Sequence, residues 1–197
     1  MALVTRGRCH DRRGRWFGLL LVWLLASSLA AGLLGAAVLT ESEVKAGFLY
    51  HFGWFVEWPA TAVQSREPVF ILGVLGAKPV GDVLDEVMQG KTVLERPVVV
   101  QYYQRAEDAV ESHVLFISTS EAYRLSTILT VLGRTPVLTV SAMARFAERG
   151  GMIELRLVDR KVHFDVNLDA AERAGLKLSS QLLRLAKVIH GAPRGRE

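Results

Sequence analysis

Four histidines lie beyond residue 40, and histidine is the side chain that most often transfers protons or binds zinc near neutral pH. They are His51, His113, His163 and His190. No two of them are four residues apart, and none stands in an H-E-x-x-H sequence, so the spacing brings no set of zinc ligands together. We therefore predict no metal site, and structural roles for His113 and His163.

Serine and aspartate form no evident catalytic set either. No serine stands in a G-x-S-x-G sequence, which would place it on the exposed turn of a hydrolase. Ser118 and Ser141 follow apolar runs and have the positions of helix caps. Asp165 and Asp169 could form a carboxylate pair, but Asp169 begins a helical pattern, so capping explains it better. We expect no catalytic residues, no cofactor and no enzymatic activity.

Gly73 and Gly76 end an apolar run and could bring the backbone close to a phosphate at the start of a following helix. They lack the G-x-G-x-x-G spacing and the lysine–hydroxyl pair of a phosphate loop, so a tight turn explains them better. Open α/β sheets nevertheless bind small molecules at the carboxyl ends of their strands. Four residues are expected at such ends and define a candidate ligand crevice: Gly76, Ser118, Ser141 and Asn167.

The segment from Thr40 to about Glu57 has the pattern of a helix with two aromatic faces. Thr40 and Glu43 have capping-box spacing, and Pro59 ends the pattern. One stripe contains Val44, Phe48, Phe52 and Phe55, and the other contains His51, Trp54 and Trp58. The second stripe is either a contact surface for a partner or a sign that the helix is buried all round.

A last helix is expected over residues 178–189. Its apolar face contains Leu178, Leu182, Leu185 and Ile189. Arg184 and Lys187 are expected to be exposed on it. The candidate partner-binding residues are therefore His51, Trp54, Trp58, Arg184 and Lys187.

Residues 1–37 have the composition of a secretory signal of the Gram-negative type. Five arginines and one aspartate accompany an apolar run that extends from Trp16 to Leu39, with small residues suited to cleavage at 35–37. The run is long for a cleaved signal, so an uncleaved membrane anchor is the alternative.

This segment accounts for the net positive charge of the chain. The whole chain has 24 basic and 20 acidic residues, and residues 1–37 carry the same excess of four, so residues 38–197 are neutral. We therefore expect no nucleic-acid partner. The single cysteine, Cys9, lies in the signal, so the exported part has no thiol for a disulfide or a metal site.

Strand and helix patterns alternate along the rest of the chain. Strands are expected at 69–75, 97–103, 114–117 and 136–140, and helices at 80–87, 105–112, 118–133 and after Ser141. Two further strands, 152–158 and 162–166, are joined by a turn.

This order predicts an α/β fold with three layers. A mainly parallel central sheet has helices on both faces and a C-terminal antiparallel β-hairpin. Residues 38–190 are expected to form a single domain, and residues 191–197 a disordered tail.

Several segments occur in the order found in a known family. The most specific are V-H-F-D-V-N-L at 162–168, R-A-G-L at 173–176 and L-S-S-Q-L-L-R-L-A at 178–186. The others are V-K-A-G-F-L-Y-H-F and V-E-W-P within 44–59, the run 70–76 followed by Pro79, H-V-L-F-I at 113–117, P-V-L-T at 136–139, F-A at 146–147 and G-G-M-I at 150–153. Over about residues 41–189 the chain resembles the YfiR family of exported bacterial proteins.

The resemblance implies a periplasmic, homodimeric regulator without enzymatic activity. Family members bind the periplasmic sensor domain of an inner-membrane diguanylate cyclase and hold it inactive, which lowers cyclic di-GMP signalling and biofilm formation. Membrane contact is then expected only through the partner or an uncleaved signal. Some members carry disulfides that tune their state, but residues 38–197 contain no cysteine, so control through the protein's own thiols is excluded. The alternative is a periplasmic small-ligand-binding sensor domain that acts on another membrane receptor or a histidine kinase.

Overall fold

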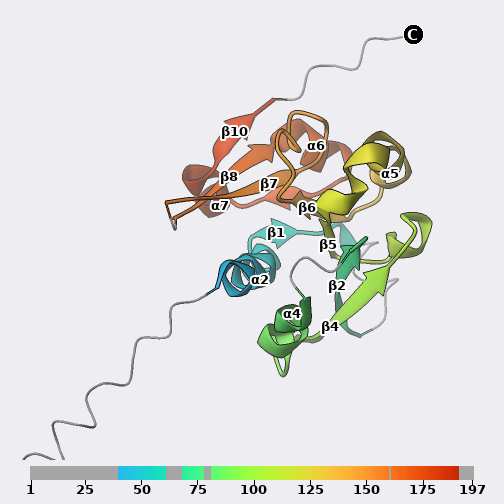
Figure 1. The fold of residues 1–197 in the computed structure, drawn as a ribbon, viewed down its shortest axis with the longest axis vertical. Coiled ribbons are helices and arrows are strands. Elements are labelled where there is room, and N and C mark those ends of the chain that lie inside the picture. The colour runs from blue at the N-terminus through green and yellow to red at the C-terminus, as the bar shows by residue number, and fades with distance from the viewer. Residues whose placement is uncertain (1–39, 61–67, 78–80, 160, 191–197) are drawn as a thin grey trace, which may run out of the picture. The chain divides into compact units, whose positions relative to one another are not determined.

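The computed structural model describes residues 40–60, 68–77, 81–159 and 161–190. The predicted signal and the predicted C-terminal tail lie outside this part. Within it, eight strands form one sheet in the order β10-β8-β7-β6-β5-β2-β4-β3, and β1 and β9 form a second, two-stranded sheet (Figure 1). The strands are β1 (Val56–Glu57), β2 (Phe70–Leu75), β3 (Thr92–Val93), β4 (Arg96–Tyr103), β5 (Val114–Ile117), β6 (Leu138–Ser141), β7 (Ile153–Val158), β8 (Lys161–Asn167), β9 (Lys177–Leu178) and β10 (Lys187–Ile189).

The helices of the described part are α2 (Glu41–Phe52), α4 (Gly81–Met88), α5 (Leu125–Leu132), α6 (Leu168–Arg173) and α7 (Ser180–Leu185), with 3-10 helices η1 (Glu107–Ala109) and η2 (Thr119–Arg124). The expected helix at 105–112 is thus reduced to the short η1. The helix expected at 80–87 is present as α4 from Gly81, and residue 80 lies outside the described residues.

The predicted mixed α/β fold with a mostly parallel sheet is confirmed. Five neighbouring pairs of the large sheet are parallel, from β4 through β2, β5 and β6 to β7 and again between β8 and β10. β7 and β8 are antiparallel, with Ile153 opposite Val166 and Val158 opposite Lys161. They do not end the sheet, because β10 pairs with β8 beyond them.

Alternate residues of the central strands enter two hydrophobic cores. Val114 and Phe116 of β5 belong to the larger core, together with residues of α2, α4, α6 and α7. Leu115 and Ile117 belong to the smaller core, with residues of η1 and α5. Because successive side chains of a strand point to opposite faces, the two cores lie on opposite faces of the sheet.

Helix α2 begins as predicted but ends earlier. Thr40 and Glu43 form the capping box, with the Thr40 backbone N–H donating to the Glu43 carboxylate at 2.5 Å. The helix ends at Phe52, so the prediction of a helix to about Glu57 was wrong. Gly53 is the C-cap, and the chain then becomes extended in β1, where it finds a strand partner in β9. A distant strand thus overrides the local helical pattern.

The helix expected over 118–133 is divided. Ser118 is a cap, as predicted, but it caps η2 by accepting a hydrogen bond from the backbone N–H of Ser120. α5 begins only at Leu125. The helix expected after Ser141 is absent, because residues 142–150 form turns and Arg145 has a left-handed φ of 60°.

The C-terminal segment departs most from the prediction. Asn167, and not Asp169, caps α6, because its side-chain oxygen accepts a hydrogen bond from the backbone N–H of Ala170 at 2.9 Å. The single helix expected over 178–189 is replaced by β9, α7 and β10. The open edge of β8 offers backbone hydrogen bonds to the chain end, which stop the helix at Leu185.

Candidate functional site

Two segments predicted to contact a partner lie next to each other. β1 follows α2 and pairs with β9, which precedes α7, so that Val56 faces Leu178. The backbone N–H of Ser179 donates to the carbonyl of Phe55 at 2.9 Å. The C-terminal end of α2 and the N-terminal end of α7 are therefore joined through the backbone, although they are far apart in the sequence.

Trp58 is a core residue. Its side chain is 8% exposed, and its ring contacts the ring edges of Phe70 at 5.5 Å and His113 at 6.0 Å between centroids. The prediction of Trp58 as a surface contact was wrong, because the chain is already extended at this point and turns the indole into the larger core. His113 is also buried, and its Nδ1 accepts the backbone N–H of Ile71 at 3.1 Å, which confirms its structural role.

Trp54 has the opposite environment. It is 50% exposed, and the neighbouring His51 is exposed at the end of α2. Across the β1–β9 ladder, Leu185 of α7 is 76% exposed and Arg184 is exposed beside it. We use the name junction surface for four exposed residues of the two segments that this ladder joins: His51, Trp54, Arg184 and Leu185. It combines an exposed indole, an exposed leucine and an arginine. Tryptophan and arginine are enriched among the hot-spot residues of protein interfaces.

Lys187 does not belong to this surface. It lies in β10 opposite Asp165 of β8. The neighbours of Asp165 along β8, Phe164 and Val166, enter the larger core, so Asp165 and Lys187 face the other side of the sheet. The prediction that Lys187 and Arg184 share one contact surface depended on a continuous helix over residues 178–189, and the structure has no such helix.

The carboxyl ends of β2 and β5 are filled by the protein itself. Gly76 donates its backbone N–H to the carbonyl of Tyr103 at 3.1 Å, and Ala77 donates to the hydroxyl of Ser120 at the same distance. Glu121 is 5% exposed, packs against Gly76 and pairs with Arg124. A carboxylate therefore occupies the place where an open α/β sheet would bind an anionic ligand.

Ser118 follows β5 and Ser141 ends β6, the next two strands after β2 in the sheet order, but their side chains already form hydrogen bonds within the protein. The Ser141 hydroxyl donates to the carbonyl of Ile117 at 2.7 Å and accepts from the backbone N–H of Met143 at 3.1 Å. Asn167 donates its side-chain amide to the carbonyl of Ala147 at 2.7 Å. Asn167 lines a cavity that none of the other three crevice residues lines. The structure therefore does not assemble Gly76, Ser118, Ser141 and Asn167 into one crevice.

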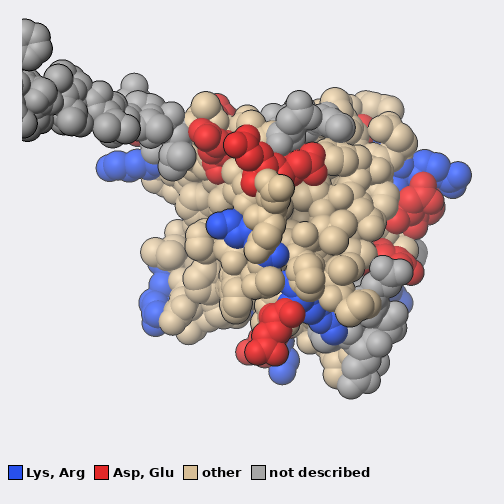
Figure 2. Space-filling view, turned by 90° about the horizontal axis from the view of Figure 1, so that it is seen from below, with Lys and Arg blue, Asp and Glu red and all other residues tan. Residues whose placement is uncertain are grey.

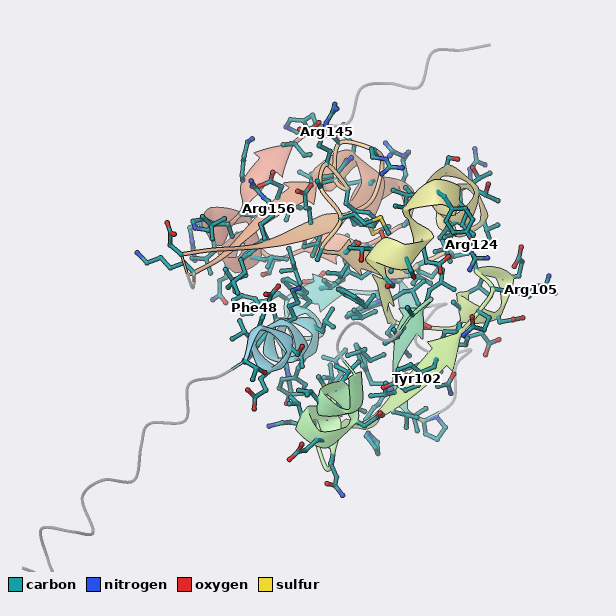
Figure 3. All side chains as sticks on the ribbon, in the orientation of Figure 1. Phe48, Tyr102, Arg105, Arg124, Arg145 and Arg156 are labelled. Atoms are coloured by element: carbon teal, nitrogen blue, oxygen red, sulfur yellow. The ribbon has the colours of Figure 1, made fainter. Side chains whose placement is uncertain are left out.

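A charged cluster on β7 and β8 was not predicted from the sequence. Glu154 lies directly opposite Asp165 in the antiparallel ladder, and both are buried. Arg156 joins them, with its Nη2 at 2.5 Å from Asp165 and its Nε at 3.6 Å from Glu154 (Figure 3). The predicted strands, 152–158 and 162–166, would align Glu154 with Val166, and only the observed register, with Val158 opposite Lys161, places Glu154 opposite Asp165. One guanidinium bridges the two carboxylates and links the two strands, so each carboxylate has a partner.

The charged and metal-binding side chains of the described residues do not indicate a metal site or a nucleic-acid surface. Among the described residues, no group of three or more His, Cys, Asp or Glu side chains is placed to hold a metal ion. In the same part of the chain, no helix is both long and apolar enough to cross a membrane. Seen from below, charged side chains lie in separate small groups on a mostly uncharged face, which carries no continuous basic stripe (Figure 2).

Comparison with known proteins identifies the family. The model of the YfiR/HmsC-like family matches residues 42–187, which include every described element from α2 to the start of β10. This chain belongs to the YfiR/HmsC-like family. The membership confirms the resemblance derived from the sequence segments and supports a role in the regulation of cyclic di-GMP signalling.

A solved structure has a related fold. It is the crystal structure of a conserved domain protein from Vibrio cholerae O1 biovar El Tor, with a TM-score of 0.52 and 13% sequence identity. The similarity covers 76% of this chain and 60% of the other, so the chain spans about three fifths of that protein. No functionally curated protein is similar enough to this chain to count as a match.

Proposed function

We propose that the protein is a periplasmic regulator that binds the sensor domain of an inner-membrane diguanylate cyclase and represses it. Repression would lower cyclic di-GMP signalling and biofilm formation. Membership of the YfiR/HmsC-like family carries this proposal. The signal-like composition of residues 1–37 supports the compartment, and the occupied polar side chains at the strand ends favour a binding protein over an enzyme.

The junction surface is the proposed contact with the cyclase. Trp54 supplies a large rigid side chain that loses little conformational freedom on binding, and Arg184 forms no ion pair with another described residue. Leu185, which is 76% exposed, adds apolar area to this contact. Repression follows if this surface binds the inactive state of the sensor more tightly than the active state, because a ligand shifts a two-state equilibrium only by that difference.

The experiment measures cellular cyclic di-GMP in a strain that lacks the gene. Complementation with the wild-type gene should lower the nucleotide level, and Trp54→Ala should fail to do so. Tyr123→Ala is the matched control, because Tyr123 is 82% exposed on η2 and lies outside the junction surface. If deletion of the gene leaves cyclic di-GMP unchanged, the proposed function is wrong. If Trp54→Ala represses as well as the wild type, the function stands and the contact surface is wrong.

We also propose that the protein acts as a homodimer, as the family resemblance implies. Light scattering of the purified protein measures the mass of the particle directly. A monomeric mass at all protein concentrations up to that in the cell would contradict this proposal. It would leave the proposed contact with the cyclase untouched.

A further inference from the structure

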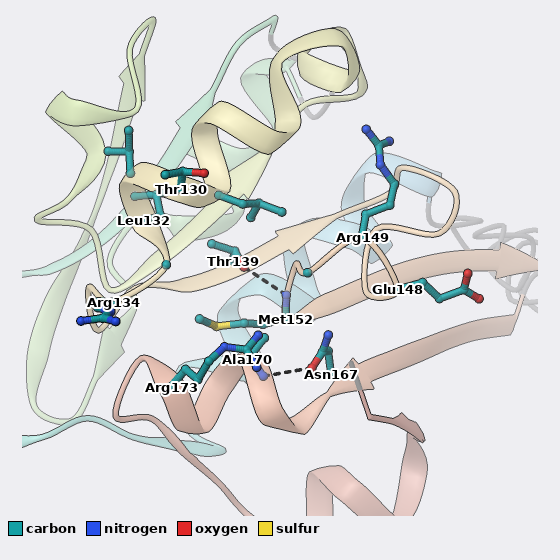
Figure 4. A pocket seen from close by; sticks show the side chains of 14 residues that line it. Thr130, Leu132, Arg134, Thr139, Glu148, Arg149, Met152, Asn167, Ala170 and Arg173 are labelled. Atoms are coloured by element: carbon teal, nitrogen blue, oxygen red, sulfur yellow. Dashed lines mark hydrogen bonds between the residues drawn. The ribbon is translucent and has the colours of Figure 1, made fainter. Parts of the chain in front are cut away.

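A cavity of about 1050 Å³ lies between α5, β6, the turn before β7 and α6. Its floor is apolar, with Leu129, Leu132, Met152 and Ala170 all buried. Arginines from three separate parts of the chain line it: Arg134 after α5, Arg149 before β7 and Arg173 at the end of α6. In Figure 4, Arg134 and Arg149 stand on opposite sides of the cavity, and Arg173 extends between them. We call this site the arginine groove.

The charges of the arginine groove are not balanced from within. Its one acidic lining residue, Glu148, binds Arg145, with 2.7 Å between Oε2 and Nε, and Arg145 does not line the cavity. This hydrogen bond holds the pKa of Glu148 below its usual value, so Glu148 is ionised and already paired. Arg149 donates one Nη2 hydrogen bond to the carbonyl of Ala122 at 3.2 Å. Arg134 and Arg173 form no ion pair or hydrogen bond with any other described residue.

Helix termination does not account for these arginines. Cations at a helix C-terminus often bind its free carbonyl groups. At the end of α6, however, Gly175 donates to the carbonyl of Glu172 and Leu176 donates to that of Ala171, which together form a Schellman motif. At the end of α5, Thr135 donates both its backbone N–H and its hydroxyl to the carbonyl of Leu132. These carbonyl groups are bound without Arg173 and Arg134, and neither guanidinium group binds another described residue, so both are available.

We propose that the arginine groove binds a small organic anion with an apolar body, such as a carboxylic acid or a phosphate monoester. A guanidinium group binds these anions through two parallel hydrogen bonds, and the buried leucine and methionine side chains of the floor accept an apolar ring or chain. The volume is in the range of sites that enclose a small molecule. No residue of the junction surface lines the groove, so this site is independent of the proposed contact with the cyclase.

The test compares phenyl phosphate with phenol, which has the same ring but lacks the charged phosphate group. Calorimetric titration of the protein, purified after expression of the full chain, should show that phenyl phosphate binds at least about tenfold more tightly than phenol. Arg134→Gln and Arg173→Gln should each weaken phenyl phosphate binding by about tenfold. Arg173→Lys keeps the charge but loses the paired hydrogen bonds, so it should weaken phenyl phosphate binding by less than Arg173→Gln does.

Arg184→Gln is the matched control, because it removes an exposed arginine outside the cavity. It should leave phenyl phosphate binding unchanged. The proposal is wrong if the wild type does not bind phenyl phosphate, if phenol binds as tightly, or if Arg184→Gln weakens binding as much as Arg173→Gln. All the substituted arginines are exposed, so circular dichroism should show native folding in each variant.

Discussion

Trp58 should tolerate replacement by phenylalanine but not by alanine. The indole is 8% exposed and packs edge-on against Phe70 and His113 in the larger core. Truncation of a buried aromatic side chain to alanine costs about 3–5 kcal/mol. A domain of this size has a free energy of unfolding of about 5–15 kcal/mol, so Trp58→Ala removes a large part of its stability.

Phenylalanine keeps an aromatic ring in this place and removes a second, unfavourable feature. The indole Nε1 of Trp58 is buried and has no hydrogen-bond partner among the described residues. A buried donor without a partner costs about 1–3 kcal/mol. Its removal therefore offsets much of the stability that Trp58→Phe loses through its smaller side chain. The expected decrease in the free energy of unfolding for Trp58→Phe is therefore below about 1.5 kcal/mol.

Urea unfolding followed by far-ultraviolet circular dichroism measures both changes, with linear extrapolation to water. Trp54→Ala is the control, since Trp54 is 50% exposed and its replacement should change stability by less than about 1 kcal/mol. If Trp58→Phe destabilises as much as Trp58→Ala, the indole N–H is satisfied and the reasoning about the buried donor is refuted. If Trp58→Ala unfolds at the wild-type urea concentration, Trp58 is not a core residue.

Three further changes follow from the backbone and the caps. Gly76→Ala should cost about 2 kcal/mol or more, because φ is +92° there and a Cβ would collide with the buried carboxylate of Glu121. Gly90→Ala has φ +69° but open space around the Cβ, so it should cost about 1 kcal/mol. Urea midpoints measure both changes in stability. Asn167→Ala should cost about 2–3 kcal/mol, because it removes the cap of α6 and a buried hydrogen bond, and thermal unfolding measures this loss. The hydrogen bonds from Thr40 lower the pKa of Glu43 from 4.5, so the capping box stabilises α2 above that pH and is lost as the pH falls through the folded-state pKa. The protection factors of the first-turn amides, which are corrected for the intrinsic exchange rate, should fall there in the wild type and stay constant in Glu43→Gln.

The central strands could be predicted because their signals are local. Val114–Ile117 is a continuous apolar run between polar residues, and such runs are typical of strands buried on both faces. The capping box of α2 was also predictable, since it depends on Thr40 and Glu43 alone. By contrast, the end of α2 depends on β9, and β10 depends on the open edge of β8. No residue within 53–57 or 187–189 encodes these partners, so the helical spacing there was misleading.

The site was predictable only in part for the same reason. The pattern placed Trp54 and Trp58 on one helical face, whereas the break at Gly53 sends one indole outward and the other into the core. The arginine groove could not be found from the sequence, because α5 and α6 pack into different cores and the fold alone brings Arg134 and Arg173 to one cavity. Its signal in the sequence would have been two arginines near the ends of helices, one in the last turn of α6 and one after the C-cap of α5.

The ladder between β1 and β9 also determines when the protein can fold. It joins residues near the start of the folded part to residues near its end, so the larger core cannot close around α2 until Leu178 is available. Closing so long a loop costs chain entropy that no local contact repays beforehand, and contacts of this kind slow folding. A chain that is still being synthesised or threaded through a membrane has no complete version of this core. If the protein is exported, as proposed, this topology delays collapse until the C-terminal segment has emerged on the far side, where α2, α7 and the exposed Trp54 take their places together.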